Sequence, residues 1–148
     1  MSNLTTCIMK EQDLESVLEI NNLCFSPPWT ISALKNELKN KFSKYLILKL
    51  ANKVIGYAGI WIIIDEAHIT NIAIHPDFRG IGGSDVLMNS IIDICKENRI
   101  PAITLEVREN NFPAVSLYKK YNFIQEGLRK DYYGKGINAI LMWKRDFL

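Results

Sequence analysis

A glycine-rich turn between an apolar segment and an amphipathic segment constrains this chain more than any other feature. Gly80, Gly82 and Gly83 follow a strand-like run at 72–74 and precede a run with helical spacing. Glycines at the start of a helix leave backbone N–H groups unhindered by side chains, and such groups bind anions, typically phosphate. A plain strand-to-helix turn has the same pattern, so the glycines alone leave both interpretations open.

Composition and charge indicate one globular domain and exclude several kinds of partner. Of the 148 residues, 48% are hydrophobic and 23% charged, with a net charge of +2, the ordinary globular balance. The basic residues are scattered apart from a modest group at Arg129, Lys130 and Lys135, which does not favour nucleic-acid binding. No apolar run approaches the ~18 residues of a membrane helix, and residues 1–6 show no signal-peptide pattern. We expect a soluble cytoplasmic protein of one domain, residues 1–148, that binds neither nucleic acid nor membrane.

The cysteines and histidines do not form a recognisable metal or disulfide pattern. Cys7, Cys24 and Cys95 are far apart and lack Cys-x-x-Cys spacing, and His68 and His75 have no carboxylate at metal-ligand spacing. We expect three reduced thiols that are at least partly buried, and no metal site.

Periodicity and turn residues predict seven strands and four helices in one mixed sheet with helices on both faces. The expected strands are 4–9, 45–50, 54–64, 67–74, 102–108, 123–127 and 139–144, and the expected helices are 14–25, 31–39, 82–97 and 111–121. The strand, glycine turn, helix and strand around residue 80 predict a right-handed parallel crossover. Tyr132 and Tyr133 are predicted to lie in the loop between the last two strands.

The glycine turn does not match two common phosphate-binding motifs. No Gly-x-x-x-x-Gly-Lys-Ser/Thr run is present, and the run at 80–83 does not supply Gly-x-Gly-x-x-Gly. The run from Arg79 to Ser84 instead resembles the signature Arg/Gln-x-x-Gly-x-Gly/Ala of the GCN5-related N-acetyltransferase (GNAT) family. The resemblance covers nearly the whole chain and includes 70–74, 105–108, Asn111, 114–118, 121–123, 132–133 and 139–142.

This resemblance implies the GNAT fold, an α/β (mixed α+β) architecture with a twisted, mostly antiparallel central sheet of about seven strands and helices on both faces. It also implies an acetyl-CoA-dependent N-acetyltransferase with acetyl-CoA as co-substrate and no metal. Within the family, the chain is most similar to bacterial enzymes that acetylate the N-terminal alanine of ribosomal protein S18. The implied partner is therefore the N-terminal peptide of that protein.

The resemblance also implies where the co-substrate binds. Backbone N–H groups from Gly80 to Ser84 would hold the pyrophosphate of CoA, the edge of 71–74 would pair with the pantetheine amides, and Asn111 would lie near the thiol. The implied cofactor-binding residues are Ile72, Ala73, Ile74, Arg79, Gly80, Ile81, Gly82, Gly83, Ser84, Asn111 and Tyr118.

Three positions depart from the family pattern. Ser84 stands where the signature has Gly or Ala, and Asp85 stands where a basic residue is common. The Asp85 carboxylate is expected to weaken the binding of an anionic phosphate. Asn138 stands where the relatives that acetylate ribosomal proteins have Asp, which bears on the acceptor side.

The reaction needs a base for the acceptor ammonium, whose pKa is about 7.7 to 8.0, and an acid for the departing thiolate. The resemblance assigns these catalytic roles to Glu106 and Tyr118. Without the resemblance, the residues themselves favour the structural interpretations: Glu106 as an edge carboxylate paired with a lysine, and Tyr118 as a core aromatic residue with an exposed hydroxyl. Cys95 is expected roughly 18 Å along the helix from the turn, and the other two cysteines belong to the N-terminal part. We therefore expect direct transfer in a ternary complex.

The acceptor side is implied by two aromatic segments, 27–29 and 132–133, which alternatively are ordinary solvent-facing loops with anchoring aromatics. The implied substrate-binding residues are Trp29, Asn71, Glu106, Tyr132 and Tyr133. Two other functions stay open at this point: an acetyltransferase for a small amine or a lysine side chain, and a non-catalytic acyl-CoA-binding module. An assay of acetyl-CoA hydrolysis or transfer separates the enzyme from the binding module.

Overall fold

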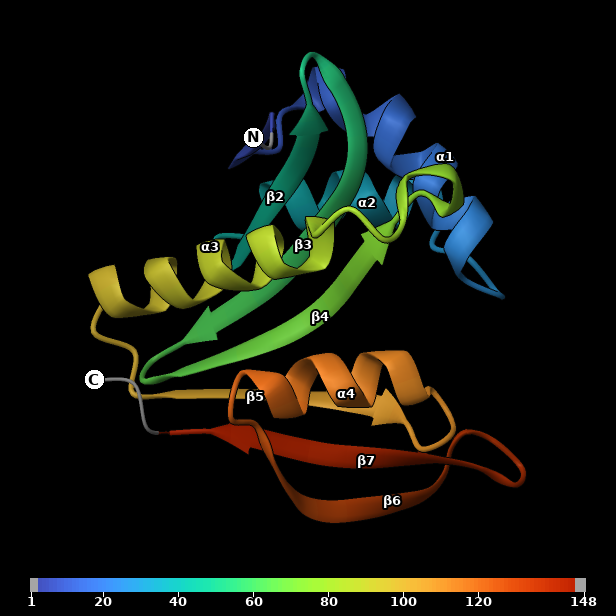
Figure 1. Ribbon diagram of the computed structural model, residues 1–148, viewed down its shortest axis with the longest axis vertical. Coiled ribbons are helices and arrows are strands. Elements are labelled where there is room, and N and C mark those ends of the chain that lie inside the picture. The colour runs from blue at the N-terminus through green and yellow to red at the C-terminus, as the bar shows by residue number, and fades with distance from the viewer. Residues whose placement is uncertain (1–2, 146–148) are drawn as a thin grey trace.

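One seven-stranded sheet runs through the whole molecule, in the order β1-β2-β3-β4-β5-β7-β6 (Figure 1). The computed structural model describes residues 3–145. The strands are β1 (Leu4–Ile8), β2 (Ser43–Leu50), β3 (Lys53–Ile63), β4 (Glu66–Ile74), β5 (Ala102–Arg108), β6 (Ile124–Gly134) and β7 (Ile137–Lys144). The helices are α1 (Leu14–Cys24), α2 (Ile31–Lys39), α3 (Gly83–Glu97) and α4 (Phe112–Lys120). The predicted order and the mixed sheet are confirmed.

Local sequence signals set the limits of these helices. The Thr30 side chain accepts a hydrogen bond from Ala33 N and caps α2, and the Asn111 side chain accepts one from Ala114 N and caps α4. Gly82 is the N-cap of α3 and has a left-handed φ of +89°, which glycine adopts without steric cost. The glycine turn is therefore a true strand-to-helix junction, as its sequence predicts.

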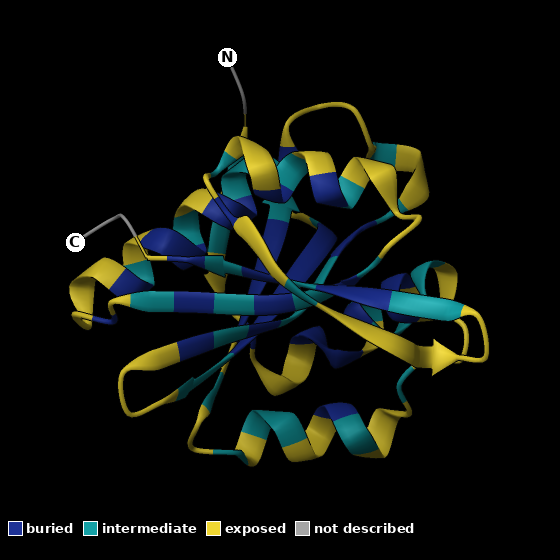
Figure 2. Ribbon diagram, turned by 90° about the horizontal axis from the view of Figure 1, so that it is seen from below, coloured by how far each residue is buried: buried dark blue, intermediate teal, exposed yellow. Residues whose placement is uncertain are grey.

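The prediction that Tyr132 and Tyr133 lie in a loop is wrong, because both belong to β6. β6 pairs with β7 through an irregular stretch, in which Arg129 faces Ala139 and Gly134 faces Ile137. Hydrogen bonds close this stretch: Asp131 N donates to Asn138 Oδ1, and Gly136 N donates to Asp131 Oδ1. The strand therefore continues to a tight turn at 135–136 and presents both tyrosines on the outermost strand, most of which is exposed (Figure 2).

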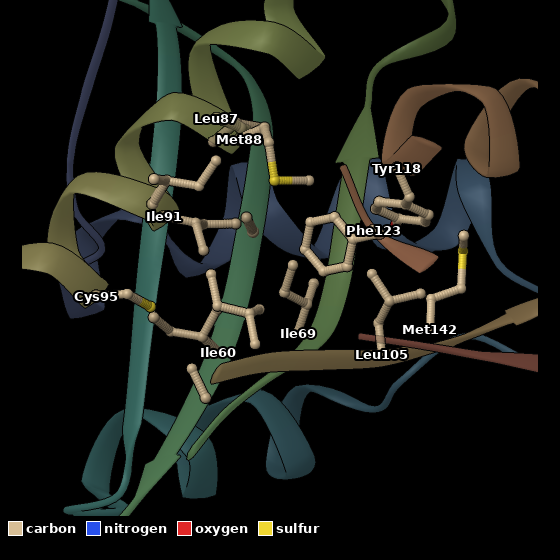
Figure 3. Packing of buried hydrophobic residues seen from close by; sticks show 14 of the residues in the cluster. Ile60, Ile69, Leu87, Met88, Ile91, Cys95, Leu105, Tyr118, Phe123 and Met142 are labelled. Carbon is tan, nitrogen blue, oxygen red and sulfur yellow. The ribbon is translucent and has the colours of Figure 1, made fainter. Parts of the chain in front are cut away.

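Two apolar layers hold helices on both faces of the sheet. Figure 3 shows the larger layer, in which α3 and α4 cover one face and Leu87, Ile91 and Tyr118 meet Ile60 and Leu105 of the sheet. The helices α1 and α2 cover the opposite face, with a core of Met9, Leu14, Val17, Ile20, Leu34, Tyr45, Ile47, Tyr57 and Ala73. Burying a large aliphatic side chain contributes about 1.5–3 kcal/mol, so each layer fixes its helices firmly.

The contact between β4 and β5 is short and sets the shape of the molecule. The two strands pair in parallel only from Glu66 to His68, opposite Ala102 to Thr104. Beyond that point they diverge, β4 toward α1 and β5 toward α4 (Figure 1). A register shift between Gly59 and Ile60 adds one residue to β4 here, and such a bulge bends a strand. The divergence opens the sheet in its middle.

The described chain shows two further features that bear on the sequence predictions. None of its helices is long and apolar enough to cross a membrane. The three cysteines are free thiols, of which Cys95 is buried, Cys24 is partly buried and Cys7 is exposed. The expectation that all three are at least partly buried is therefore wrong for Cys7, which lies on the edge strand β1.

Candidate active site

A cleft of about 830 Å³ lies between β4 and β5, where the two strands diverge. Seven of the residues predicted for the site line it together: Trp29, Asn71, Ile72, Glu106, Asn111, Tyr118 and Tyr133. Other lining residues were not predicted from the sequence, among them Cys24, Phe25 and Arg108. The cleft thus brings together groups from both halves of the sheet and from three helix ends or loops.

The remaining predicted residues do not line this cleft. They are Ala73, Ile74, the turn Arg79 to Ser84, and Tyr132. Ile74 ends β4, and the Arg79 guanidinium folds back to donate to Ile74 O at 3.2 Å and to Cys24 Sγ at 3.4 Å. The turn therefore lies next to the end of the strand that lines the cleft, and Figure 1 shows it at the N-terminus of α3.

The glycine turn has the geometry of an anion site. Gly80 and Gly82 have φ values of +83° and +89°, and a Cβ on either would meet no atom within 4 Å. The first intrahelical hydrogen bond of α3 runs from Val86 N to Gly82 O, so the backbone N–H groups before Val86 fall in the unpaired first turn. An open, left-handed turn with free N–H groups and the positive end of a helix dipole suits a phosphate.

The carboxylate of Asp85 in this first turn has partners of its own. Lys120 Nζ and the Tyr121 hydroxyl each donate to Asp85 Oδ1 at 2.7 Å. These two hydrogen bonds, that of Lys120 first, hold the pKa of Asp85 below its ordinary value. The contact joins α4 to α3 and brings an ammonium group to the turn, so the charge of Asp85 is balanced locally.

Glu106 lies on the face of β5 opposite the larger apolar layer and is held from both sides. Its Oε2 lies 2.6 Å from His68 Nε2 on β4, and its Oε1 lies 3.6 Å from Arg129 Nε on β6. The side chain of Glu106 is only 11% exposed. A shielded carboxylate on the lining of a cleft can accept a proton from a bound amine.

Neither partner of Glu106 was predicted from the sequence. His68 alternates with Ile69 on β4 like any residue of a half-buried strand, and Arg129 is separated from Glu106 by the whole of α4. Only the strand order brings them together: β4 and β6 flank the β5–β7 pair. The available sequence signal was limited to a histidine and a glutamate on two strands predicted to be parallel.

Tyr118 lies on α4 within the larger apolar layer (Figure 3). It also lines the cleft. Its ring packs against Phe123 with centroids 5.7 Å apart, and the residue is 8% exposed. Burial raises the pKa of its phenol above the ordinary value, so the hydroxyl stays protonated at neutral pH. Tyr118 is thus a core residue that also lines the cleft.

On the α1 side of the cleft, buried amides fix the walls. Asn21 is fully buried: its Nδ2 donates to Trp29 O at 2.8 Å, and its Oδ1 accepts from Trp29 N at 3.2 Å. The Asn71 Oδ1 accepts a hydrogen bond from the Tyr45 hydroxyl at 3.2 Å. The Tyr45 ring lies against Gly59, where a Cβ would come within 2.4 Å of a ring carbon, so only glycine fits there. Since each lost hydrogen bond would leave a buried polar group unpaired, these contacts hold the position of the wall.

The comparison with known proteins gives the family. Residues 14–123 match the acetyltransferase (GNAT) family. The chain belongs to the GNAT acetyltransferase family. It is 41% identical over 137 residues to a Bacillus subtilis protein provisionally named a ribosomal protein bS18-alanine N-acetyltransferase, with 91% of each chain covered. It is 39% identical to the Haemophilus influenzae enzyme of that name, covering 88% of this chain and 90% of the relative.

A solved structure supports the fold of this GNAT chain. The ribosomal-protein-S18-alanine N-acetyltransferase of Escherichia coli superposes with a TM-score of 0.88 at 24% identity, covering 98% of this chain and 95% of the other. The family and these relatives make the chain an acetyl-CoA-dependent N-acetyltransferase. Among residues 3–145, no group of three His, Cys, Asp or Glu side chains is placed to hold a metal ion.

Proposed function

We propose that this acetyltransferase transfers the acetyl group of acetyl-CoA to the α-amino group of the N-terminal alanine of ribosomal protein bS18. Two relatives, which align with 91% and 88% of this chain, are named for that activity. The observation that carries the proposal is the cleft between β4 and β5, because a shielded carboxylate and a neutral phenol line it together. A ribosomal acceptor also implies that the enzyme works in the cytoplasm.

For acetyl-CoA, we propose that the turn from Gly80 to Ser84 binds the pyrophosphate through its backbone N–H groups. The edge of β4 near Ile72, which has no β5 partner beyond His68, is free to pair with the amides of pantetheine as an added strand would. Asn111 lines the cleft at the start of α4. Lys120, paired with Asp85, offsets the negative charge of that carboxylate beside the turn.

For the chemistry, Glu106 accepts a proton from the acceptor ammonium, directly or through a water molecule, and the neutral amine then attacks the thioester carbonyl. Tyr118 donates its phenolic proton to the sulfur of the departing thiolate. Transfer is direct, in a ternary complex. Cys24 does line the cleft, but its Sγ donates to Ile74 O and accepts from Arg79, and burial raises the pKa of Cys95 to about 11, which makes it a poor nucleophile. An acetylated cysteine trapped on the kinetic pathway would contradict direct transfer.

For the acceptor, Trp29 and Tyr133 are the aromatic walls that we propose to flank the incoming N-terminus. Both line the cleft, one from the α1–α2 loop and the other from β6. The Arg108 guanidinium lies over the Tyr133 ring, 4.9 Å from its centroid, and packs against this wall. Tyr132 packs edge-on against Tyr133 with centroids 5.0 Å apart, so its proposed part is to support that wall.

The proposal is tested with a panel of synthetic peptides that share one sequence and differ in the first residue. Each peptide is incubated with the enzyme and acetyl-CoA, and mass spectrometry measures the acetylated fraction. We expect the peptide that begins with alanine to be acetylated fastest, and a matched peptide with a blocked N-terminus to remain unmodified. Preference for free lysine or a polyamine over every peptide would favour the small-amine alternative instead.

A further inference from the structure

We propose that Lys120 binds the pyrophosphate of acetyl-CoA directly, reaching it from α4, and that Asp85 holds the lysine in place. This inference rests on the proposed binding of the pyrophosphate to the turn from Gly80 to Ser84. Lys120 Nζ lies 2.7 Å from Asp85 Oδ1, and Asp85 belongs to the first turn of α3. The ammonium group is therefore one short side chain away from the backbone N–H groups that are proposed to hold the anion.

The Lys120 ammonium has donors to spare for a phosphate. A lysine ammonium carries three N–H donors. Asp85 accepts from it, and the part of the chain from residue 3 to residue 145 offers it no second hydrogen-bond acceptor. The Lys120 side chain is 62% exposed. An incoming phosphate oxygen can therefore accept from the ammonium while the contact with Asp85 stays in place.

The carboxylate that holds Lys120 is itself fixed by the fold. The Tyr121 hydroxyl also donates to Asp85 Oδ1, at 2.7 Å. Lys144 Nζ on β7 donates to Tyr121 O, likewise at 2.7 Å. The end of α4 is thus tied to the sheet on one side and to the first turn of α3 on the other, and these contacts keep the lysine beside the turn.

Two other basic side chains near the turn make different contacts. The Arg79 guanidinium donates to Ile74 O at the end of β4. Lys53 Nζ lies over the Phe78 ring, 5.0 Å from its centroid. Neither contact involves the first turn of α3. Lys120, by contrast, hydrogen-bonds to a residue of that turn, and this makes it the cation best placed for the pyrophosphate.

This arrangement accounts for a carboxylate in the first turn of a helix that is proposed to bind an anion. The Asp85 carboxylate alone would repel the pyrophosphate, whereas an ammonium placed between the two anions attracts both. Hydrogen bonds between charged groups are also stronger than those between neutral groups. Because α3 follows β4 and α4 follows β5, a pyrophosphate bound in this way contacts both sides of the divergence between the two strands.

The test removes the charge of Asp85 first, so that direct binding can be told from mere charge compensation. If Lys120 only offsets Asp85, then adding Lys120→Met to Asp85→Asn changes nothing. If Lys120 binds the pyrophosphate, the double variant should bind acetyl-CoA about fivefold more weakly than Asp85→Asn, a modest factor because solvent screens exposed charges. Calorimetric titration measures both affinities and needs no acceptor, and equal affinities would overturn the proposal.

A matched control and a conservative variant exclude a merely structural effect. Lys119 is the neighbouring exposed lysine of α4 and points roughly 100° away around the helix, so Lys119→Met should leave the affinity unchanged. Lys120→Arg keeps the charge and should retain most of the affinity. The loss in the double variant should shrink at ~1 M salt, where the Debye length is about 3 Å. A loss that is independent of salt, or equal in Lys119→Met, would contradict a direct contact.

Two further titrations locate the contact and separate this inference from the proposed function. Dephospho-CoA lacks the 3′-phosphate but keeps the pyrophosphate, so Lys120→Met should weaken its binding by the same factor as that of CoA; a loss seen only with CoA would place the ammonium at the 3′-phosphate and overturn the assignment. Equal affinities of Gly82→Asp and Gly82→Asn for acetyl-CoA would overturn the proposed turn site together with this inference. Unequal affinities there, with no effect of Lys120→Met, would overturn this inference alone.

Discussion

At the scale of single residues, the chemistry depends on what surrounds two ordinary side chains. Glu106 differs from other strand glutamates because His68 and Arg129 occupy its two oxygens inside a cleft. Tyr118 differs from other core tyrosines because its layer of the core ends at the cleft. Both residues were predicted from the resemblance to the GNAT family. Their neighbours were missed, because strand order and register decide those contacts.

Replacing Glu106 by glutamine tests the base. Because the acceptor ammonium must lose a proton before it attacks, kcat should fall on the order of 10²-fold near pH 7 and recover as pH rises above the amine pKa of about 8. The measurement is the pH–rate profile from a thiol-release assay. Glu109→Gln is the matched control, because this exposed glutamate directly follows β5, the strand that carries Glu106. An unchanged pH–rate profile in Glu106→Gln would show that Glu106 is not the base.

Replacing Tyr118 by phenylalanine tests the acid. The ring packing with Phe123 is retained, so acetyl-CoA should bind with nearly unchanged affinity while kcat falls on the order of 10²-fold. Because burial raises the pKa of this phenol, the wild-type enzyme should show no loss of activity from its ionisation up to pH 9. Calorimetric titration with acetyl-CoA provides the control, and a pure binding defect would count against the acid role.

At the scale of elements, the candidate site depends on the glycine turn and on the divergence of β4 and β5. The turn was predictable, because glycines with positive φ at a helix start leave a clear pattern in sequence. The divergence of β4 and β5 was not, since their pairing ends after His68 although both strands continue beyond it. The position of Tyr132 and Tyr133 in β6 was also missed, because the sequence Tyr-Tyr-Gly-Lys-Gly is typical of a turn. In the structure, Asp131 N donates to the Asn138 side chain, and β6 continues to Gly134.

Replacing Gly82 by aspartate tests the anion site, with Gly82→Asn as the matched control. Both residues tolerate a left-handed φ comparatively well, they have similar size, and the space above Gly82 is open. The two variants therefore differ mainly in charge. The aspartate should weaken acetyl-CoA binding at least about tenfold relative to asparagine, which corresponds to ~1.4 kcal/mol. Equal affinities in calorimetry would show that the pyrophosphate binds elsewhere.

Replacing Asp85 by asparagine tests the contact between α3 and α4. The pKa of Asp85 is lowered in the folded state, chiefly by Lys120, so its contribution to stability is present above the unfolded value of 3.8 and is lost as pH falls through the folded value. Solvent screens this exposed pair, so the free energy of unfolding should drop by about 0.2–1 kcal/mol at pH 7. The difference from wild type should narrow below pH 4 in urea titrations.

Lys120→Met serves as the control for this contact. It should produce a loss of similar size at pH 7, and the double variant should lose little more than either single variant. Strict additivity of the two losses would mean that the hydrogen bond between α3 and α4 does not stabilise the fold.

At the scale of the whole molecule, two blocks of sheet meet along a short parallel ladder and open into a cleft. The first block, β1 to β4 with α1, α2 and α3, supplies the turn, Trp29 and Asn71. The second, β5 to β7 with α4, supplies Glu106, Tyr118 and Tyr133. Neither block has a complete site. The order of elements could be predicted from periodicity, whereas the completed site required the tertiary arrangement of both blocks.

The central claim is that this cleft delivers acetyl groups to an α-amine. It is tested most directly with one peptide that begins with alanine and contains one internal lysine, incubated with acetyl-CoA and the wild-type enzyme. Fragmentation in the mass spectrometer then locates the acetyl group. The account predicts a single acetyl group on the N-terminal alanine, and none on lysine. Acetylation of the lysine with a free N-terminus, or equal acetylation by Glu106→Gln, would contradict it.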